Sequence, residues 1–223
     1  MSGIEAATAR AITRDWARMF PAFQPWRPLR LLRRLGPLVQ GITLERSPAG
    51  DDYLPTAHVH ALTRDFPVVS LTLAQRLLTP SGVPERIKVA RHDKDGEEAG
   101  QRLAGQSALP LHMVPTLDQV VERYRSFVAG QQRGLRLPTG VAELEDCVLL
   151  PAVAGRPDLS ADALTFARKT AEGWNEPPHG YPGTGEWLDQ LGLLAGDSGR
   201  LEGTVAAQTV KHKLTRLPDL WAA

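Results

Sequence analysis

The first strong pattern along the chain is helical. Apolar side chains recur every three or four positions over residues 4–19, and Pro21 follows them. Because an α-helix has about 3.6 residues per turn, these side chains share one face, and the pattern predicts an amphipathic N-terminal helix. A second, short helix is predicted over residues 28–35, since Pro28 suits the first turn of a helix and the Gly-Pro pair at 36–37 favours its end.

The pattern then changes to short segments that are rich in β-branched and apolar residues, which is typical of strands. These segments cover residues 39–47, 53–64, 66–73 and 86–91. Residues 48–52, Pro-Ala-Gly-Asp-Asp, favour a turn, so the first two segments are predicted to form a hairpin. Residues 71–78 could equally form a helix, because a short apolar run has no decisive period.

Beyond residue 97 the pattern is mostly helical. Thr116 and Gln119 stand three positions apart, ahead of an apolar stripe that reaches Val128, and this predicts a helix that starts with a capping box. Three later helices are predicted over residues 160–171, 184–194 and 203–214. Ser160 and Thr184 are the predicted N-caps of the first two of these.

The order of the predicted elements is a helix, then strands, then helices, and segregated elements of this kind favour an α+β fold. We therefore expect a small antiparallel sheet over about residues 38–92, flanked by an N-terminal helix and a mostly helical C-terminal half. The Gly- and Gln-rich stretch at 130–134 suggests an α+β domain, 1–132, and a helical C-terminal subdomain, 133–223, packed on it. A single domain agrees equally well with the chain length.

The composition is that of a globular chain. Of its 223 residues 42% are hydrophobic and 23% are charged, so a packed core can form. No apolar run approaches the roughly 20 residues of a membrane span, and the N-terminus lacks the basic and apolar regions of a secretory leader. Cys147 is the single cysteine, which excludes an intrachain disulfide and a cysteine-based zinc cluster. These features favour a cytoplasmic protein.

The net charge of +1 provides no general attraction to nucleic acid or membrane, so no membrane partner is expected. Positive charge is nevertheless concentrated in residues 1–46, which contain eight arginines and three acidic residues. Four of these arginines would share one side of the predicted second helix: Arg27, Arg30, Arg33 and Arg34. Guanidinium groups pair with carboxylates and phosphates, so this side is a candidate contact surface for another protein; a purely solvated helix face is the alternative.

The segment 174–183 contains three prolines and two glycines, which excludes regular structure there. It also contains one histidine and two aromatic residues, and restricted loops with aromatic anchors are common at binding surfaces. Trp174, His179 and Tyr181 are therefore predicted to contact a partner. In the alternative interpretation the loop is a structural crossover whose two aromatic side chains fill the edge of the core.

His58 and His60 stand two positions apart in a predicted strand, where alternate side chains point to the same face of a sheet. Neutral imidazole is the commonest protein ligand of zinc and related ions. A third ligand is offered by His92 or Asp93, at the end of a later strand candidate. A metal site made of His58, His60 and His92 is the alternative to histidines that only hydrogen-bond with their neighbours on a partly solvated sheet.

The sequence contains no P-loop, no G-x-G-x-x-G after a strand, no H-E-x-x-H and no paired C-x-x-C. The excess of arginine over lysine is typical of a high-GC bacterial genome. We therefore predict a non-enzymatic accessory protein without a cofactor, which binds another protein of the same bacterial operon, as in immunity or defence systems. Two alternatives remain: a metal-dependent hydrolase that uses a divalent metal such as zinc at the His58–His60 pair, and a nucleic-acid-binding subunit.

Overall fold

The computed structural model describes residues 4–132 and 136–221. Contacts divide the chain into two compact units. The first unit contains the described residues up to His60, Ser70–Val114 and the residues from Arg216 onward, and the second contains Ala61–Val69 and Pro115–Thr215. The predicted domain boundary between residues 132 and 133 falls on a segment, 133–135, that lies outside the described residues, so this boundary stays a prediction.

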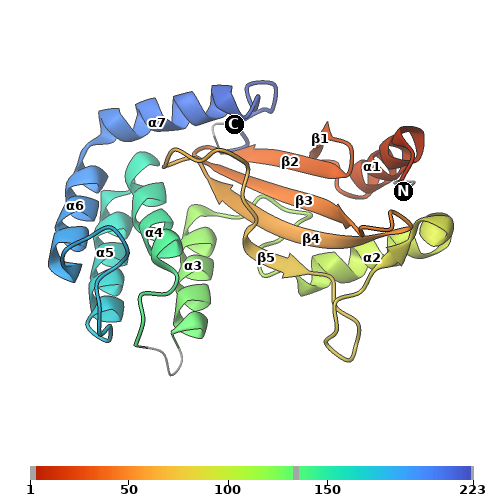
Figure 1. The fold of residues 1–223 in the computed structure, drawn as a ribbon. Helices are drawn as coiled ribbons and strands as arrows, with labels where there is room; N and C mark the ends of the chain where they lie inside the picture. Colours follow the sequence, from red (N-terminus) through yellow and green to blue (C-terminus); the bar gives the residue numbers. More distant parts are fainter. Residues whose placement is uncertain (1–3, 133–135, 222–223) are drawn as a thin grey trace. The chain divides into compact units, whose positions relative to one another are not determined.

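In the described part of the first unit, six strands form one sheet that carries two α-helices (Figure 1). The strands are β1 (Gln24–Arg27), β2 (Arg30–Leu35), β3 (Leu38–Arg46), β4 (Asp52–Ala61), β5 (Thr72–Arg76) and β6 (Ile87–Lys88). The helices are α1 (Ala6–Met19), the short 3-10 helix η1 (Val89–Arg91) and α2 (His92–Gln106). The strand order is β1-β2-β3-β4-β5, with β6 paired to β4. The α+β class and the small antiparallel sheet are thereby confirmed.

The core of the first unit lies between one face of this sheet and the helices α1 and α2, which contact each other (Figure 1). The apolar stripe of α1 is buried there, as the helical spacing of its residues predicts. Alternate residues of a strand point to opposite faces, so only every second strand residue enters this core. The main contributors are Ile12, Trp16, Phe20, Leu31, Ile42, Tyr53, Ala57, Ala99 and Leu103.

The predicted helix over residues 28–35 is wrong, because these residues form strand β2 and the turns on either side of it. Pro28 and Leu29 connect Arg27 to its partner Arg30 in a tight turn, and Leu29 has a positive φ of 63° there. The next turn, Gly36-Pro37, joins the paired residues Leu35 and Leu38, and Gly36 has a φ of 55°. Proline and glycine punctuate turns as well as helix ends, and here they close two hairpins.

The rest of the sheet follows the prediction in part. The hairpin of β3 and β4 is confirmed, and the backbone N–H of Ser47 donates to the carbonyl of Asp52 across it at 3.1 Å. The strand predicted over residues 66–73 is displaced to β5, which also shows that residues 71–78 do not form a helix. The strand predicted over 86–91 is only two residues long and leads directly into η1.

Five helices make up the described part of the second unit (Figure 1). They are α3 (Leu117–Gln131), α4 (Val141–Val153), α5 (Pro157–Ala171), α6 (Thr184–Gly196) and α7 (Ser198–Lys211). Helix α4 packs against all four others, which explains why it is buried over most of its length. No helix among the described residues has the length and the apolar character needed to cross a membrane.

The observed starts of the helices in this unit agree only in part with the N-caps predicted from the sequence. The capping box of Thr116 and Gln119 is confirmed, with both reciprocal hydrogen bonds present. Ser160 is not an N-cap, because α5 begins at Pro157 and the Ser160 hydroxyl donates to the carbonyl of Val148 at 2.9 Å. Thr184 is the first residue of α6 and makes no capping hydrogen bond. The last helix begins at Ser198, five residues earlier than predicted, with Asp197 as its cap.

Candidate functional site

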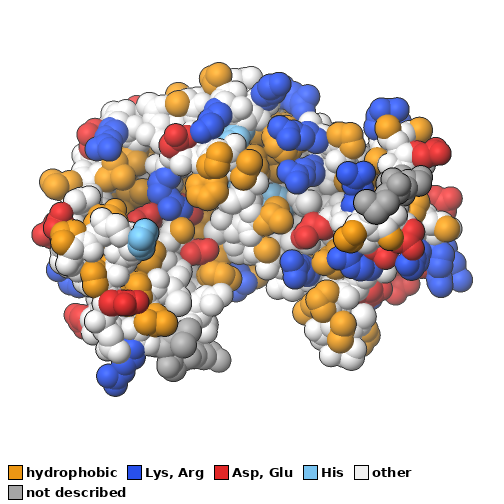
Figure 2. All heavy atoms as spheres, in the orientation of Figure 1, with side chains coloured by type: hydrophobic (Ala, Val, Ile, Leu, Met, Phe, Trp, Pro, Cys, Tyr) orange, Lys and Arg blue, Asp and Glu red, His pale blue; other side chains and the backbone are white. Residues whose placement is uncertain are grey.

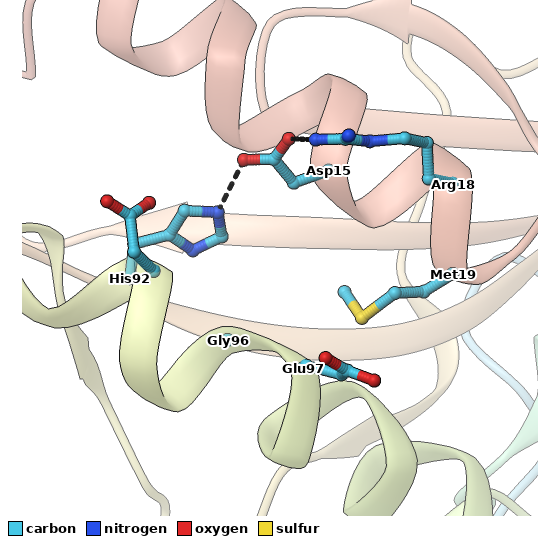
Figure 3. A pocket seen from close by; sticks show the side chains of 7 residues that line it. Asp15, Arg18, Met19, His92, Gly96 and Glu97 are labelled. Carbon is cyan, nitrogen blue, oxygen red and sulfur yellow. Dashed lines mark hydrogen bonds and ion pairs between the residues drawn. The ribbon is translucent and has the colours of Figure 1, made fainter.

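One polar group of the first unit is centred on His92, the first residue of α2 (Figure 3). Its Nδ1 lies 2.7 Å from the hydroxyl of Tyr53, and its Nε2 lies 3.0 Å from Oδ2 of Asp15. The indole N–H of Trp16 donates to the Tyr53 hydroxyl at 3.4 Å. A continuous chain of hydrogen bonds thus joins Trp16 and Asp15 of α1, Tyr53 of β4 and His92 of α2.

The protonation of this chain follows from its donors and acceptors. A carboxylate can only accept, so Nε2 of His92 carries the proton that it donates to Asp15, and in the neutral ring Nδ1 accepts from Tyr53. Burial raises the pKa of the Tyr53 hydroxyl to about 12, which keeps it protonated as a donor. Burial alone would raise the pKa of Asp15, but hydrogen bonds from Arg18 and His92 outweigh it and lower that pKa.

The His92 ring is also held from below by the helix that carries it. A Cβ atom placed on Gly96, one turn further along α2, would lie 2.7 Å from Nδ1 and 2.8 Å from Cε1 of His92. Only glycine leaves room for the ring in this position, because real Cβ atoms do not approach heavy atoms so closely. The imidazole is thus fixed by Gly96, Tyr53 and Asp15 together.

This group opens onto a cleft of about 510 Å³, which we call the α1–α2 cleft (Figure 3). It is lined by Asp15, Arg18, Met19, His92, Asp93, Gly96 and Glu97. The ligand atoms of Asp15, His92 and Asp93 all lie within 4.8 Å of one another, and among the described residues no other set of three His, Cys, Asp or Glu side chains does so. One imidazole and two carboxylates can hold a divalent cation.

His58 and His60 lie on the opposite face of the sheet from Tyr53, and the structure does not bring them together with His92. His58 Nε2 is 3.0 Å from the hydroxyl of Thr43, and Nδ1 of His60 is 2.8 Å from the hydroxyl of Ser70. The predicted metal site of His58, His60 and His92 is therefore not assembled. His92 lies beside Tyr53, and Tyr53 and His58 are five positions apart on β4, so their side chains point to opposite faces of the sheet. His92 finds Asp15 and Asp93 instead.

His58 is the more tightly enclosed of the two strand histidines. A Cβ on Gly41 of β3 would lie 2.3 Å from its Nε2, so the ring occupies the space that this glycine leaves open. Burial lowers the pKa of His58 to about 3, and the nearby charges of Arg30 and His60 act in the same direction. This imidazole is neutral at physiological pH and bonds with neutral neighbours.

The four arginines of the predicted helix face do not share a surface. Arg27 ends β1, and in β2 the side chain of Arg33 points to the opposite face of the sheet from those of Arg30 and Arg34. Arg33 is 2% exposed, stacks over the Phe23 ring at 4.4 Å and donates to Gln40 and to backbone carbonyls of residues 110, 111 and 113. Burial lowers the pKa of its guanidinium to about 10. Arg34 pairs with Asp219 at 3.1 Å.

Arg27, by contrast, is exposed and stacks over the Trp26 ring at 4.1 Å, and Arg30 is half-buried. Figure 2 shows Lys and Arg side chains gathered over β1 and β2 on the visible face. A basic surface therefore exists at this edge of the sheet, but Arg33 takes no part in it.

The second unit has a separate cleft of about 580 Å³, which we call the α6 cleft. Its apolar lining is formed by Leu149, Tyr181, Trp187, Leu191, Leu193 and Leu194, and its polar lining by Arg64, Glu145, Gln190, Asp197 and Arg200. The segment 174–183 contributes directly to it through Tyr181. His179 is exposed outside this lining.

Trp174 is turned inward. Its indole N–H donates to Oε1 of Gln132 at 3.1 Å, and its ring packs on Trp187 with 5.4 Å between centroids. Of the three aromatic and histidine residues predicted to contact a partner, Trp174 therefore supports the wall of the α6 cleft and Tyr181 lines it. The inward packing of Trp174 agrees with the alternative interpretation of the loop, and partner contact by Tyr181 and His179 stays a prediction.

A buried ion-pair network supports the floor of the α6 cleft. Arg64 contacts Glu145 at 2.8 Å and Asp146 at 3.0 Å, and the Trp187 indole donates to Glu145 at 3.0 Å. Burial raises the pKa of Asp146 to about 6, although the attraction of Arg64 opposes this rise. These ion pairs link the segment 61–69 to α4.

The chain matches no protein-family model, and no curated protein or solved structure shows significant similarity to it. The site residues therefore rest on geometry alone. Sequence reasoning missed Asp15, Tyr53 and Gly96, which surround His92. Gly96 had a local signal, since it lies four positions after His92 and so on the same helix face. Asp15 and Tyr53 had none, because 77 and 39 positions separate them from His92.

Proposed function

We propose that this protein is a non-enzymatic accessory protein that binds another protein through the α6 cleft. The observation that carries the proposal is Leu193, which is 76% exposed and belongs to the lining of that cleft. A large apolar side chain at such a position costs free energy in water and is covered when a partner binds. The partner is proposed to be encoded in the same bacterial operon, as in immunity or defence systems, and to meet this protein in the cytoplasm.

The aromatic lining of the cleft supports this use. Tyr181 and Trp187 both line it, and the ring of Trp174 packs on Trp187. Aromatic side chains provide large contact areas at little cost in conformational entropy when a partner binds. Leu191 and Leu194 continue the apolar lining along α6. An amphipathic helix of a partner, with leucine-like side chains on one face, fits a surface of this kind.

The polar residues at the rim of the cleft predict the charge of the partner's contacting side chain. Glu145 is already engaged by Arg64 and Trp187, and Asp197 accepts from the backbone N–H of residue 200 as the cap of α7, at 3.0 Å. Arg200 is exposed at the rim. We therefore expect the partner helix to place an acidic side chain against Arg200. The arginines of β2 give weaker support, because Arg33 is buried and Arg34 is paired.

The test measures the affinity of this protein for the purified products of the adjacent genes by isothermal titration calorimetry. Replacing Leu193 by Asp should weaken the complex at least tenfold, since it puts a charge into an apolar contact. Val210→Asp is the matched control: Val210 is 67% exposed on α7, outside the cleft lining, and this variant should bind as the wild type does.

A second variant tests the proposed charge. Arg200→Glu should weaken the complex several-fold, and a reciprocal change of the contacting acidic residue of the partner to Lys should restore it. The proposal is overturned if no adjacent gene product binds, or if Leu193→Asp and Val210→Asp bind equally well.

A further inference from the structure

We infer that Asp15, His92 and Asp93 form a binding site for a divalent transition-metal ion at the α1–α2 cleft. Their ligand atoms lie within 4.8 Å of one another, and they come from two helices that contact each other in the same unit. Ligands at about 2.0–2.2 Å from a zinc-like ion lie no more than about 4.4 Å apart. Asp93 is exposed, so its side chain has room to rotate toward an ion.

The His92 ring is prepared for this task. Gly96 and the Tyr53 hydroxyl hold it so that Nε2 points at Asp15, as Figure 3 shows. When Nε2 binds an ion, the ring proton resides on Nδ1 and is donated to the Tyr53 oxygen. A second hydrogen bond of this kind is found around most metal-bound histidines, where it fixes the ring and its tautomer. Tyr53 is thus a positioning residue for the proposed ligand.

The charges of the cleft determine what competes with the ion. Two carboxylates compensate the two positive charges of a divalent cation, and Glu97 adds a further negative charge to the lining. Arg18 is paired with Asp15 in the structure, and its side chain is 79% exposed. A cation that binds Asp15 has to displace this guanidinium, and an exposed side chain is displaced at little cost. Arg18 therefore lowers the affinity of the site without blocking it.

The donor set also selects the ion. An imidazole nitrogen favours zinc, iron, copper or nickel over magnesium and calcium, which prefer oxygen ligands. Three protein ligands would leave at least one coordination position of the ion free. A water molecule or a small anion can occupy it. The inference does not depend on the partner proposed for the α6 cleft, which lies in the other unit.

The test is calorimetric titration of the full chain, free of any affinity tag, with Zn²⁺, and separately with Mg²⁺. We expect one Zn²⁺ per chain and at least tenfold weaker binding of Mg²⁺. Asp93→Asn should weaken Zn²⁺ binding at least tenfold, because it removes an exposed ligand that no fold contact needs. Glu98→Gln, at a 76% exposed position of the same helix outside the ligand set, is the matched control and should bind as the wild type does.

Arg18→Gln distinguishes this site from adventitious binding to surface acids. It frees Asp15 from its competing cation, so Zn²⁺ affinity should rise several-fold. Circular dichroism of each variant checks that the fold is intact. The inference is overturned if Zn²⁺ binding is not stoichiometric, if Asp93→Asn and Glu98→Gln behave alike, or if Arg18→Gln leaves the affinity unchanged.

Discussion

Two histidines of the first unit each lie against a glycine but have different surroundings. His58 lies over Gly41 on one face of the sheet, and His92 lies over Gly96 on the side of α1 and α2. Each ring fills space that only a glycine leaves, and each makes a hydrogen bond to a hydroxyl group. The same two residue types at close range are therefore not enough to define a functional site.

What separates the two histidines is the charge around them. His58 bonds to Thr43, has Arg30 nearby and stays neutral, with a pKa lowered to about 3 by burial. His92 meets a carboxylate and opens onto a cleft with two more acidic groups. A buried imidazole that has no carboxylate as a hydrogen-bond acceptor is typical of a structural residue. An imidazole that points at carboxylates in an open cleft is accessible to a cation.

The largest expected effect on stability is at Gly41, against which the His58 ring lies. Gly41→Ala should lower the free energy of unfolding by about 3 kcal/mol, the upper end of the usual cost of overpacking. The new Cβ would lie within 3 Å of both His58 and Leu32, which are buried and have no room to move. Urea denaturation measures the change.

Gly105→Ala on α2 is the control for this substitution, because a Cβ there meets nothing within 4 Å. It should be neutral or slightly stabilising. The double variant Gly41→Ala with His58→Ala should recover part of the lost stability, since the clash disappears with the ring. Equal stability of Gly41→Ala and the wild type would show that His58 is not confined.

The next effect concerns pH. The unfolded chain protonates His58 near pH 6.5, whereas the folded chain does so only near pH 3. Between these values the unfolded state holds the extra proton, so stability falls as the pH decreases from about 6.5 toward 3. From pH 6.5 to pH 4.5 this group should account for a loss of about 2–3 kcal/mol.

The measurement compares urea denaturation of the wild type and His58→Gln at several pH values. The difference in stability between them should shrink as the pH falls, because the variant has no imidazole to protonate. His179→Gln, at an exposed position, is the control, and its stability curve should run parallel to that of the wild type. Parallel curves for His58→Gln would contradict the burial argument.

A smaller pair of effects comes from the two hydroxyl partners. Thr43→Val leaves Nε2 of the buried His58 without its hydroxyl, which should cost about 2 kcal/mol. Tyr53→Phe should cost about 1 kcal/mol, because Asp15 still holds His92 at the cleft. Thermal or chemical denaturation of the two variants measures both. An equal loss of stability in the two variants would mean that the surroundings of His58 and His92 are equivalent.

The smallest stability effect is expected for Gly96→Ala. Alanine favours a helix over glycine by about 0.5–1 kcal/mol, and His92 can leave its seat toward the open cleft, so the two contributions should cancel to within about 1 kcal/mol. Zn²⁺ affinity should nevertheless fall several-fold, since the ring no longer points at Asp15. A loss of stability as large as that of Gly41→Ala would remove the distinction between the two histidines.

Several elements could be predicted from the sequence because their causes are local. The stripe of α1 and the capping box of Thr116 and Gln119 depend on residues within one or two turns of a helix. The hairpin of β3 and β4 depends on a turn sequence between two apolar segments. The α+β class follows from the order of such elements, so it could also be predicted from the sequence.

The state of residues 28–35 could not be predicted in this way. Leucines and arginines in this segment agree with either period, and Pro28 and Gly36 agree with helix ends or with turns. The pairing of β2 with β3 on one side and β1 on the other decides for the strand, since the two ladders hydrogen-bond its backbone and the sheet buries leucines on both faces. That pairing also turned Arg33 from a predicted surface residue into a buried one.

The sequence by itself determined the helices with local signals, the β3–β4 hairpin, the α+β class and the loop that borders the α6 cleft. Only the tertiary structure decided that His92 lies near Asp15 and Asp93 and away from His58 and His60. The physical reason is distance along the chain: 77 residues separate His92 from Asp15, and packing α1 and α2 on one face of the sheet brings them to 3.0 Å. Patterns along a chain report local geometry, whereas a site of this kind exists only after the core has formed.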